Sequence, residues 1–122
     1  MSQTFGPYSP IRQAGDFYYI SGQVGVDPET NMCGQTIEEQ TAQIMANLES
    51  LLATMGLGMN DIVKTTIYVK DMADFAKVND VYAGYFEPPF PARATIGAKD
   101  LPHVGGEANI KIEIDAVAYK GK

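Results

Sequence analysis

The sequence predicts a single α+β domain over residues 1–122, in which two helices cover one face of a β-sheet. Two amphipathic segments with helical spacing lie among short β-rich runs, and no linker, low-complexity segment or repeat divides the chain. Domains usually hold about 100–150 residues, so 122 residues fit one domain. The segments follow the order ββ-α-β-α-ββ. Two helices can cover only one face of such a sheet, which leaves the other face open.

The chain begins with a predicted hairpin and a long helix. Gly15-Asp16 is a turn signal between strands at residues 11–14 and 17–21, and a loop follows at residues 28–31. Thr36 and Glu39 form a capping box that begins the helix. Gly56 and Gly58 are predicted to end it. Its apolar face is expected to hold Ile37, Thr41, Ile44, Met45, Leu48, Leu51, Leu52 and Met55.

The second half of the chain predicts a strand, a helix and two more strands. Residues 62–69 alternate as a strand, with Val63, Thr65, Ile67 and Val69 on one face. Asp71 caps the second helix, which Pro88-Pro89 stops. Strands follow at about 91–98 and at 110–119. The inner stripe of the second helix is expected to hold Phe75, Val78, Tyr82, Tyr85 and Phe86.

The face of the sheet away from the helices has a mixed polar composition. It is too polar for a core and too mixed for plain solvent exposure, so we expect it to contact other subunits. In a trimer this face could line a closed barrel. Its predicted residues are Lys64, Thr66, Tyr68, Lys111, Glu113 and Asp115.

Composition excludes several classes of function. The formal net charge is -6, and the basic residues are scattered, which argues against a nucleic-acid binder. With only Cys33 and His103, the chain cannot supply a tetrahedral zinc site, and a single cysteine fits a reducing compartment. No signal peptide and no transmembrane run are present in this sequence. We therefore expect a cytoplasmic protein with no membrane partner.

Two charged residues are candidates for chemistry. Arg93 is the only arginine in an otherwise small or apolar segment, and its fork of donors matches a carboxylate. An equally open interpretation is an Arg93 that pairs with a neighbouring acid. Glu113 could orient water or shuttle a proton, although a glutamate that pairs with Lys111 or Lys64 is the simpler interpretation. Asn79 lies at the edge of the second helix's apolar stripe and would need a hydrogen-bond partner.

Several segments together resemble the RidA family, also called the YjgF family. They occur in the family's order over nearly the whole chain, and the Pro-Ala-Arg segment followed by Ile-Glu-Ile is the family signature. The matching segments are Gly6-Pro7-Tyr8-Ser9, Ile20-Ser21-Gly22-Gln23, Gly56-Leu57, Asp61-Ile62-Val63-Lys64-Thr65-Thr66, Asp74-Phe75, Val78-Asn79, Tyr85-Phe86, Phe90-Pro91-Ala92-Arg93-Ala94 and Ile112-Glu113-Ile114.

The resemblance implies a chorismate-mutase-like fold with a mixed sheet, assembled as a homotrimer with a central barrel and with sites between subunits. It implies hydrolysis of 2-imino and enamino acids, such as 2-aminoacrylate, 2-iminopropanoate and 2-iminobutanoate, to 2-oxo acids and ammonia. No cofactor and no metal are expected. Arg93 would bind the substrate carboxylate and Glu113 would position water. The substrate-binding residues implied are Tyr8, Ser21, Gly22, Asn79 and Thr95.

Two departures from the family pattern are visible, and the second keeps alternatives open. The chain before Gly6 is shorter than usual, and the stretch from His103 to Ile110 is longer than the usual turn. The longer stretch would permit a deaminase of different specificity, or a module that binds a 2-oxo acid without turnover. Some family members are described as RNA-cleaving translation inhibitors or as chaperones, and the acidic composition disfavours the RNA role.

Overall fold

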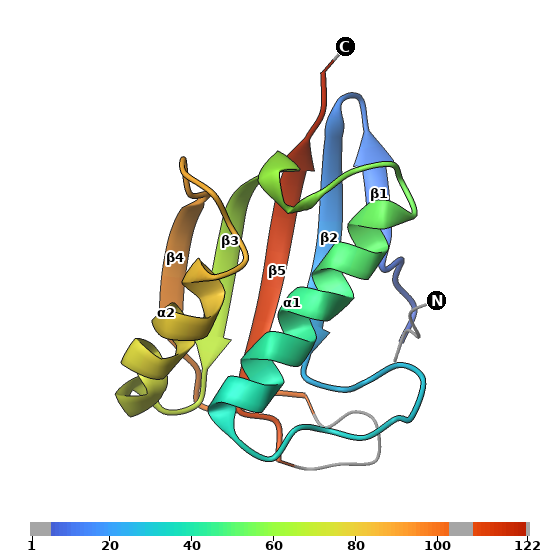
Figure 1. Ribbon diagram of the computed structural model, residues 1–122. Coiled ribbons are helices and arrows are strands. Elements are labelled where there is room, and N and C mark those ends of the chain that lie inside the picture. The colour runs from blue at the N-terminus through green and yellow to red at the C-terminus, as the bar shows by residue number, and fades with distance from the viewer. Residues whose placement is uncertain (1–5, 103–108, 122) are drawn as a thin grey trace.

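The computed structural model describes residues 6–102 and 109–121 as a five-stranded sheet with both helices on the same side (Figure 1). The strand order is β1-β2-β5-β3-β4; β3 and β4 are parallel and the other pairs are antiparallel. This mixed sheet confirms the predicted α+β fold class. The elements are β1 (Ile11–Ala14), β2 (Phe17–Val24), α1 (Ile37–Ala53), η1 (Met59–Asp61), β3 (Ile62–Val69), η2 (Met72–Asp74), α2 (Phe75–Ala83), β4 (Ala92–Gly97) and β5 (Ile112–Tyr119).

Helix α1 begins where its capping box predicts. The amide of Glu39 donates to Thr36 Oγ1 at 3.1 Å, and the amide of Thr36 donates to Glu39 Oε1 at 3.2 Å. Gly56 follows the helix with φ of 73°, a value that glycine adopts without strain. The predicted end was otherwise wrong. Met55 is 36% exposed and lies beyond the helix, and Gly58 begins the short η1 turn, because the chain has already turned at Gly56.

The predicted inner face of β3 was wrong at its first position. The register against β5 shifts between Ile62 and Lys64, and this bulge turns Val63 outward, where it is 44% exposed. After the bulge, Thr65, Ile67 and Val69 are buried, as the alternation predicts. From Thr65 onward, the strand therefore alternates as the sequence predicts.

The second helix and the last strand are shorter than predicted. Asp71 caps η2 through the amide of Ala73, and α2 ends at Ala83, before Pro88-Pro89. Phe75 is exposed instead of lining the core, since it lies at the first turn of α2 beside the outer strand β4.

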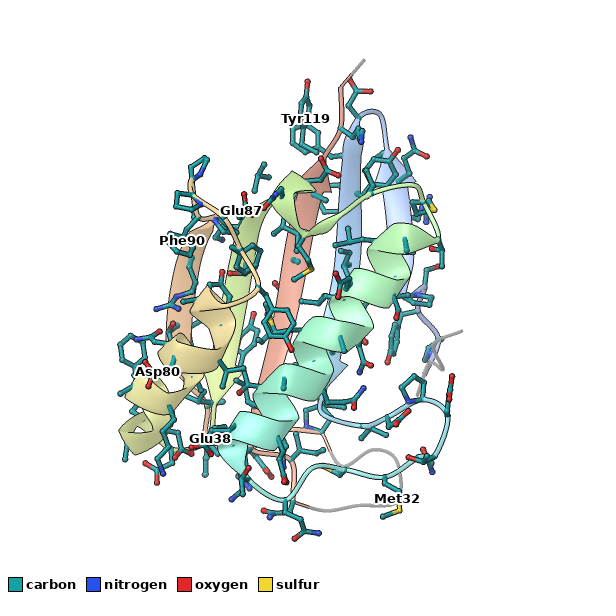
Figure 2. The ribbon with its side chains drawn as sticks, viewed as in Figure 1. Met32, Glu38, Asp80, Glu87, Phe90 and Tyr119 are labelled. Carbon is teal, nitrogen blue, oxygen red and sulfur yellow. The ribbon has the colours of Figure 1, made fainter. Side chains whose placement is uncertain are left out.

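Strand β4 lies at the outer edge of the sheet, and Phe90 lies near its beginning (Figure 2). Strand β5 begins at Ile112, because the amide of Lys111 donates to the side chain of Gln40 and not to a strand.

The two faces of the sheet differ in what covers them. The helix-facing residues of β3 and β5 pack against α1 in one core, and we call this side the covered face. The residues that alternate with them, including Thr66, Tyr68, Glu113, Asp115 and Val117, are half-buried on the other side, the open face. The described residues thus confirm that both helices cover a single face. The core residues of α1 include Ile44, Met45, Leu48 and Leu52.

Candidate active site

The predicted site residues fall into two groups on this chain. Ser21 and Gly22 of β2, Glu113 of β5 and Tyr8, which precedes β1, line one cavity, and we call them the Glu113 half-site. Asn79, Arg93 and Thr95 come from α2 and β4, and we call them the Arg93 half-site. The two half-sites are distinct in position and in chemistry.

The Glu113 half-site lines an open cavity of about 660 Å³. Glu113 is opposite Val24 in the pairing of β5 with β2, and Asp115 lies two residues further along the same face of β5. The walls of the cavity combine these carboxyl groups with apolar side chains, among them Val26, Pro28 and Pro102. Such a cavity has the volume and the mixed lining of a small-molecule site.

Gly22 makes room for the carboxyl group of Glu113. The register of β2 against β5 shifts between Ile20 and Gln23, and Gly22 lies within this irregular stretch. A Cβ atom at position 22 would collide with the Glu113 side chain, its carboxylate oxygen first. The resemblance predicted Gly22 as a substrate-binding residue. Within the chain it has a steric role, because the absence of a side chain at position 22 leaves room for the Glu113 carboxyl group.

Ser21 fixes the segment that carries Tyr8. Its hydroxyl donates to the carbonyl of Ser9 at 2.6 Å, and its amide donates to the carbonyl of Pro10 at 3.0 Å. Because this hydroxyl hydrogen is already used, Ser21 Oγ can offer a ligand only its acceptor lone pairs. Tyr8 is 45% exposed and lines the same cavity.

The carboxyl groups on the open face favour the protonated form more than ordinary ones do. Burial raises the pKa of Glu113, and the nearby charge of Asp115 raises it further. Burial also raises the pKa of Asp115, against the opposing effects of its Tyr68 hydrogen bond and of Lys64. The Tyr68 hydroxyl donates to Asp115 Oδ2 over 3.5 Å, a long and weak bond. A raised pKa brings Glu113 closer to neutral pH, where an acid–base group works best.

Ion pairing does not account for either charged candidate. Among residues 6–102 and 109–121, the ion pairs join Lys70 to Asp100 and Lys120 to Asp61. Within that part of the chain, Arg93 has no acidic partner and Glu113 has no lysine partner. The ion-pair interpretations of both residues therefore receive no support there.

Arg93 is held instead by two aromatic rings of α2. Its Cζ atom lies 5.5 Å from the centroid of the Phe75 ring and 5.1 Å from that of Tyr82. Cation–π attraction acts at this range and leaves the N–H groups of the guanidinium available for hydrogen bonds. An arginine in this state can receive a carboxylate in the bidentate manner.

Two buried polar atoms accompany Arg93. Asn79 Oδ1 and Thr95 Oγ1 are buried and have no hydrogen-bond partner among the described residues. The sequence predicted that Asn79 would need such a partner. Asn79 lies between Phe75 and Tyr82 along α2, and Thr95 lies two residues after Arg93 on the same face of β4. Buried polar atoms without a partner in their own chain commonly form hydrogen bonds with a ligand, with water or with another chain.

The two half-sites occupy opposite faces of the sheet. Arg93 is paired in register with Thr65, which is buried on the covered face, whereas Glu113 is paired with Tyr68 on the open face. Side chains three residues apart on one strand point to opposite faces. The residues predicted to act on one substrate are therefore not brought together within one chain.

Sequence reasoning missed the aromatic partners of Arg93 and the role of Asp115. Phe75 and Tyr82 were assigned to the helix core, although their spacing of seven residues, with Asn79 between them, places all three on one side of α2. Asp115 was predicted only as part of the polar face. The i, i+2 spacing of Glu113 and Asp115 on a strand was the available signal for a carboxyl pair.

Other sequence predictions concern residues or groups outside these half-sites. His103 and most of the longer stretch from 103 to 110 lie outside the described residues. Among residues 6–102 and 109–121, no set of three or more His, Cys, Asp or Glu side chains is arranged to hold a metal ion. In the same part of the chain, no helix is both long and apolar enough to span a bilayer.

The fold and the two half-sites define a class. It is a small α+β protein with a carboxyl-lined cavity on the open face of its sheet and with an arginine on the edge strand of that sheet. The sequence profile described as Endoribonuclease L-PSP matches residues 2–120. The chain therefore belongs to this family, which is the RidA, or YjgF, family. The match covers almost the whole chain and confirms the resemblance seen in the sequence.

Individual relatives show the same family membership. A RutC family protein of Pyrococcus horikoshii is 43% identical over 94% of this chain and 88% of its own length. A 2-iminobutanoate/2-iminopropanoate deaminase of Dermatophagoides farinae is 36% identical over 94% of this chain and 87% of its own. The crystal structure of RidA from Psychrobacter is 32% identical and superposes with a TM-score of 0.90, covering 98% of this chain and 93% of that one.

Proposed function

We propose that this protein is a cofactor-independent deaminase that hydrolyses 2-imino and enamino acids to 2-oxo acids and ammonia. Its substrates would be small, such as 2-aminoacrylate, 2-iminopropanoate and 2-iminobutanoate. The observation that carries the proposal is Arg93: an arginine without an acidic partner among the described residues, held by aromatic rings and flanked by buried, unpaired polar atoms. This is the arrangement that a carboxylate ligand completes.

The proposed chemistry divides between the two charged residues. Arg93 binds the substrate carboxylate and holds the C=N carbon beside an ordered water. Glu113 accepts a proton from this water as the water oxygen bonds to the carbon, and it passes this proton to the imine nitrogen, which gives the tetrahedral aminoalcohol. Glu113 then takes the hydroxyl proton of the aminoalcohol and delivers it to the amino group as the C–N bond breaks, which leaves the 2-oxo acid and ammonia. The raised pKa of Glu113 suits a group that both accepts and donates protons near neutral pH.

The proposed site requires more than one copy of the chain. Arg93 and Glu113 face opposite sides of their own sheet, so a shared substrate would lie between the Arg93 half-site of one copy and the Glu113 half-site of another. The open face also exposes apolar side chains at Tyr19 and Ile96, which a second copy would cover. We therefore propose a homotrimer with sites between subunits. Light scattering should report about three times the chain mass of 13.2 kDa.

The alternatives differ in what they require of these residues. A module that only senses 2-oxo acids would keep carboxylate binding at Arg93 and lack turnover. Binding of RNA is disfavoured by the net charge of -6 and by the carboxyl groups that line the cavity. A chaperone role would survive the loss of Arg93. The cytoplasmic location stays a prediction from the sequence.

A coupled assay tests the proposal directly. A threonine or serine dehydratase generates the imine, and semicarbazide traps whatever escapes hydrolysis. The wild-type protein should divert imine away from the semicarbazone, and Arg93→Ala should lose this effect. If the wild type leaves the semicarbazone yield unchanged with imines of serine, threonine and larger amino acids, the catalytic proposal fails. Retained binding of a 2-oxo acid would then favour the sensing module.

A further inference from the structure

We propose that Phe75 and Tyr82 are positioning residues that hold the guanidinium of Arg93 ready for a ligand carboxylate. This inference rests on the proposed binding of carboxylates by Arg93. The two rings lie 5.5 and 5.1 Å from Arg93 Cζ. They come from α2 at a spacing of seven residues, which is close to two helical turns, so one face of the helix presents both rings toward β4.

Aromatic rings hold an arginine in a way that an acid cannot. A carboxylate partner would occupy the N–H fork of the guanidinium, which is the part that a ligand carboxylate also needs. The attraction between a cation and a π system uses the ring face instead and leaves that fork available. Arg93 is thereby restrained before a ligand arrives, while its hydrogen-bonding capacity is kept for the ligand.

The ring of Tyr82 is itself fixed. Its hydroxyl lies 2.8 Å from Thr65 Oγ1 in a buried hydrogen bond, and Thr65 is the register partner of Arg93 between β3 and β4. The Phe86 ring packs against the Tyr82 ring, with their centroids 4.9 Å apart. Strand β3 therefore fixes, through Thr65, the ring against which the neighbouring strand's arginine lies.

Phe75 is the more informative of the two rings because it contributes little to the core. It is 37% exposed, whereas Tyr82 is 4% exposed. An exposed phenylalanine at the first turn of a helix gains little from burial, and the Phe75 ring contacts Arg93. Its replacement should therefore change the restraint on Arg93 while leaving the fold intact.

The test uses Phe75→Leu in the full chain and two independent measurements. Calorimetric titration with 2-oxobutanoate should show affinity about five-fold weaker than that of the wild type, the scale of one exposed cation–π contact. In ¹H–¹⁵N spectra, the Arg93 Nε–H resonance, assigned by its loss in Arg93→Lys, should move as the ring-current shift from Phe75 disappears. Tyr82→Phe keeps the ring against Arg93 but removes its bond to Thr65, so its affinity should lie between those of the wild type and Phe75→Leu.

A second α2 variant separates positioning from general loosening of the helix. Val78 is buried on the same helix, and Val78→Ala should lower the melting temperature without changing either the affinity or the Arg93 resonance. The inference is overturned if Phe75→Leu binds 2-oxobutanoate as the wild type does, or if its affinity falls while the Arg93 resonance stays in place. If Arg93→Ala binds as well as the wild type, the proposed carboxylate site fails instead, and the spectra still report whether the rings restrain Arg93.

Discussion

Arg93 and Glu113 lie on opposite faces of the same sheet, separated by strand β3. The register pairs Arg93 with Thr65 on the covered face and Glu113 with Tyr68 on the open face. No rotation of side chains brings the two groups to one small ligand within a chain, because the sheet itself lies between them. A reaction that uses both residues must take them from different copies.

Mixing two inactive variants tests this separation. Arg93→Ala and Glu113→Gln should each lose turnover alone. Co-expressed in equal amounts, they should form mixed trimers in which about a quarter of the intersubunit sites combine an intact Arg93 with an intact Glu113. Recovery of about that share of wild-type activity in the semicarbazide assay is the expected result. Mixtures that stay as inactive as the separate variants, although light scattering shows mixed assemblies, would contradict a site shared between copies.

Gly22→Ala should displace Glu113 without touching the Arg93 half-site. The added Cβ would occupy the position of the Glu113 carboxylate. We expect turnover to fall by about 100-fold, since a misplacement of about 1 Å costs that much, while binding of 2-oxobutanoate changes far less. Gly84→Ala is the matched control, because a Cβ there meets only the Val81 carbonyl at 3.5 Å. Equal losses of turnover in both variants would show that position 22 has no special role.

Asp115→Asn should shift the pH profile of turnover to lower pH. After burial, the charge of Asp115 is the second cause that raises the pKa of Glu113. Removal of this charge lowers the pKa, so Glu113 becomes a competent base at lower pH and the acid limb of the profile moves down. Two further groups lie near this carboxyl pair: Tyr68 of β3 is opposite Glu113, and the charge of Lys64 lowers the pKa of Asp115. The exposed Asp80→Asn is the control; an acid limb that stays fixed in Asp115→Asn would oppose this account.

Glu113→Gln should stabilise the fold at high pH. A carboxyl group whose pKa is raised by folding favours the folded state most when protonated, below its ordinary value of 4.5, and loses that contribution as pH rises through the raised pKa. Glutamine has no charge to bury. The variant should therefore melt at a higher temperature than the wild type at pH 8, and this difference should shrink as the pH approaches 4.5. A constant difference across this range would indicate that the charge is not the cause.

Gln40 is predicted to be a main contributor to stability near the start of β5. Its fully buried side chain donates to the carbonyls of Gly34 at 2.9 Å and Asn109 at 2.7 Å, and it accepts from the amide of Lys111 at 2.8 Å. Gln40→Met would leave these backbone groups unpaired and should lower the free energy of unfolding by about 2–4 kcal/mol. Urea denaturation measures the change. Gln43→Met removes a single side-chain bond to Asn47 and should cost clearly less; equal costs would contradict the prediction.

Local sequence signals predicted the elements well where neighbouring residues decide the structure. The capping box of Thr36 and Glu39 fixed the beginning of α1, and alternation identified the inward face of β5. The same signals were wrong where a distant partner decides. The bulge at Val63 depends on the pairing of β3 with β5, and the start of β5 depends on Gln40, which is far from it in sequence.

The sequence by itself determined the fold class, the family and the identity of the candidate residues, because periodicity, caps and motif order are properties of the chain. It could not determine how those residues group in space. Only the tertiary structure separated Arg93 from Glu113, brought Gly22 against Glu113 and put Phe75 beside Arg93. Each of these relationships joins segments that are distant in sequence, and strand register and helix packing fix them, which no local pattern encodes.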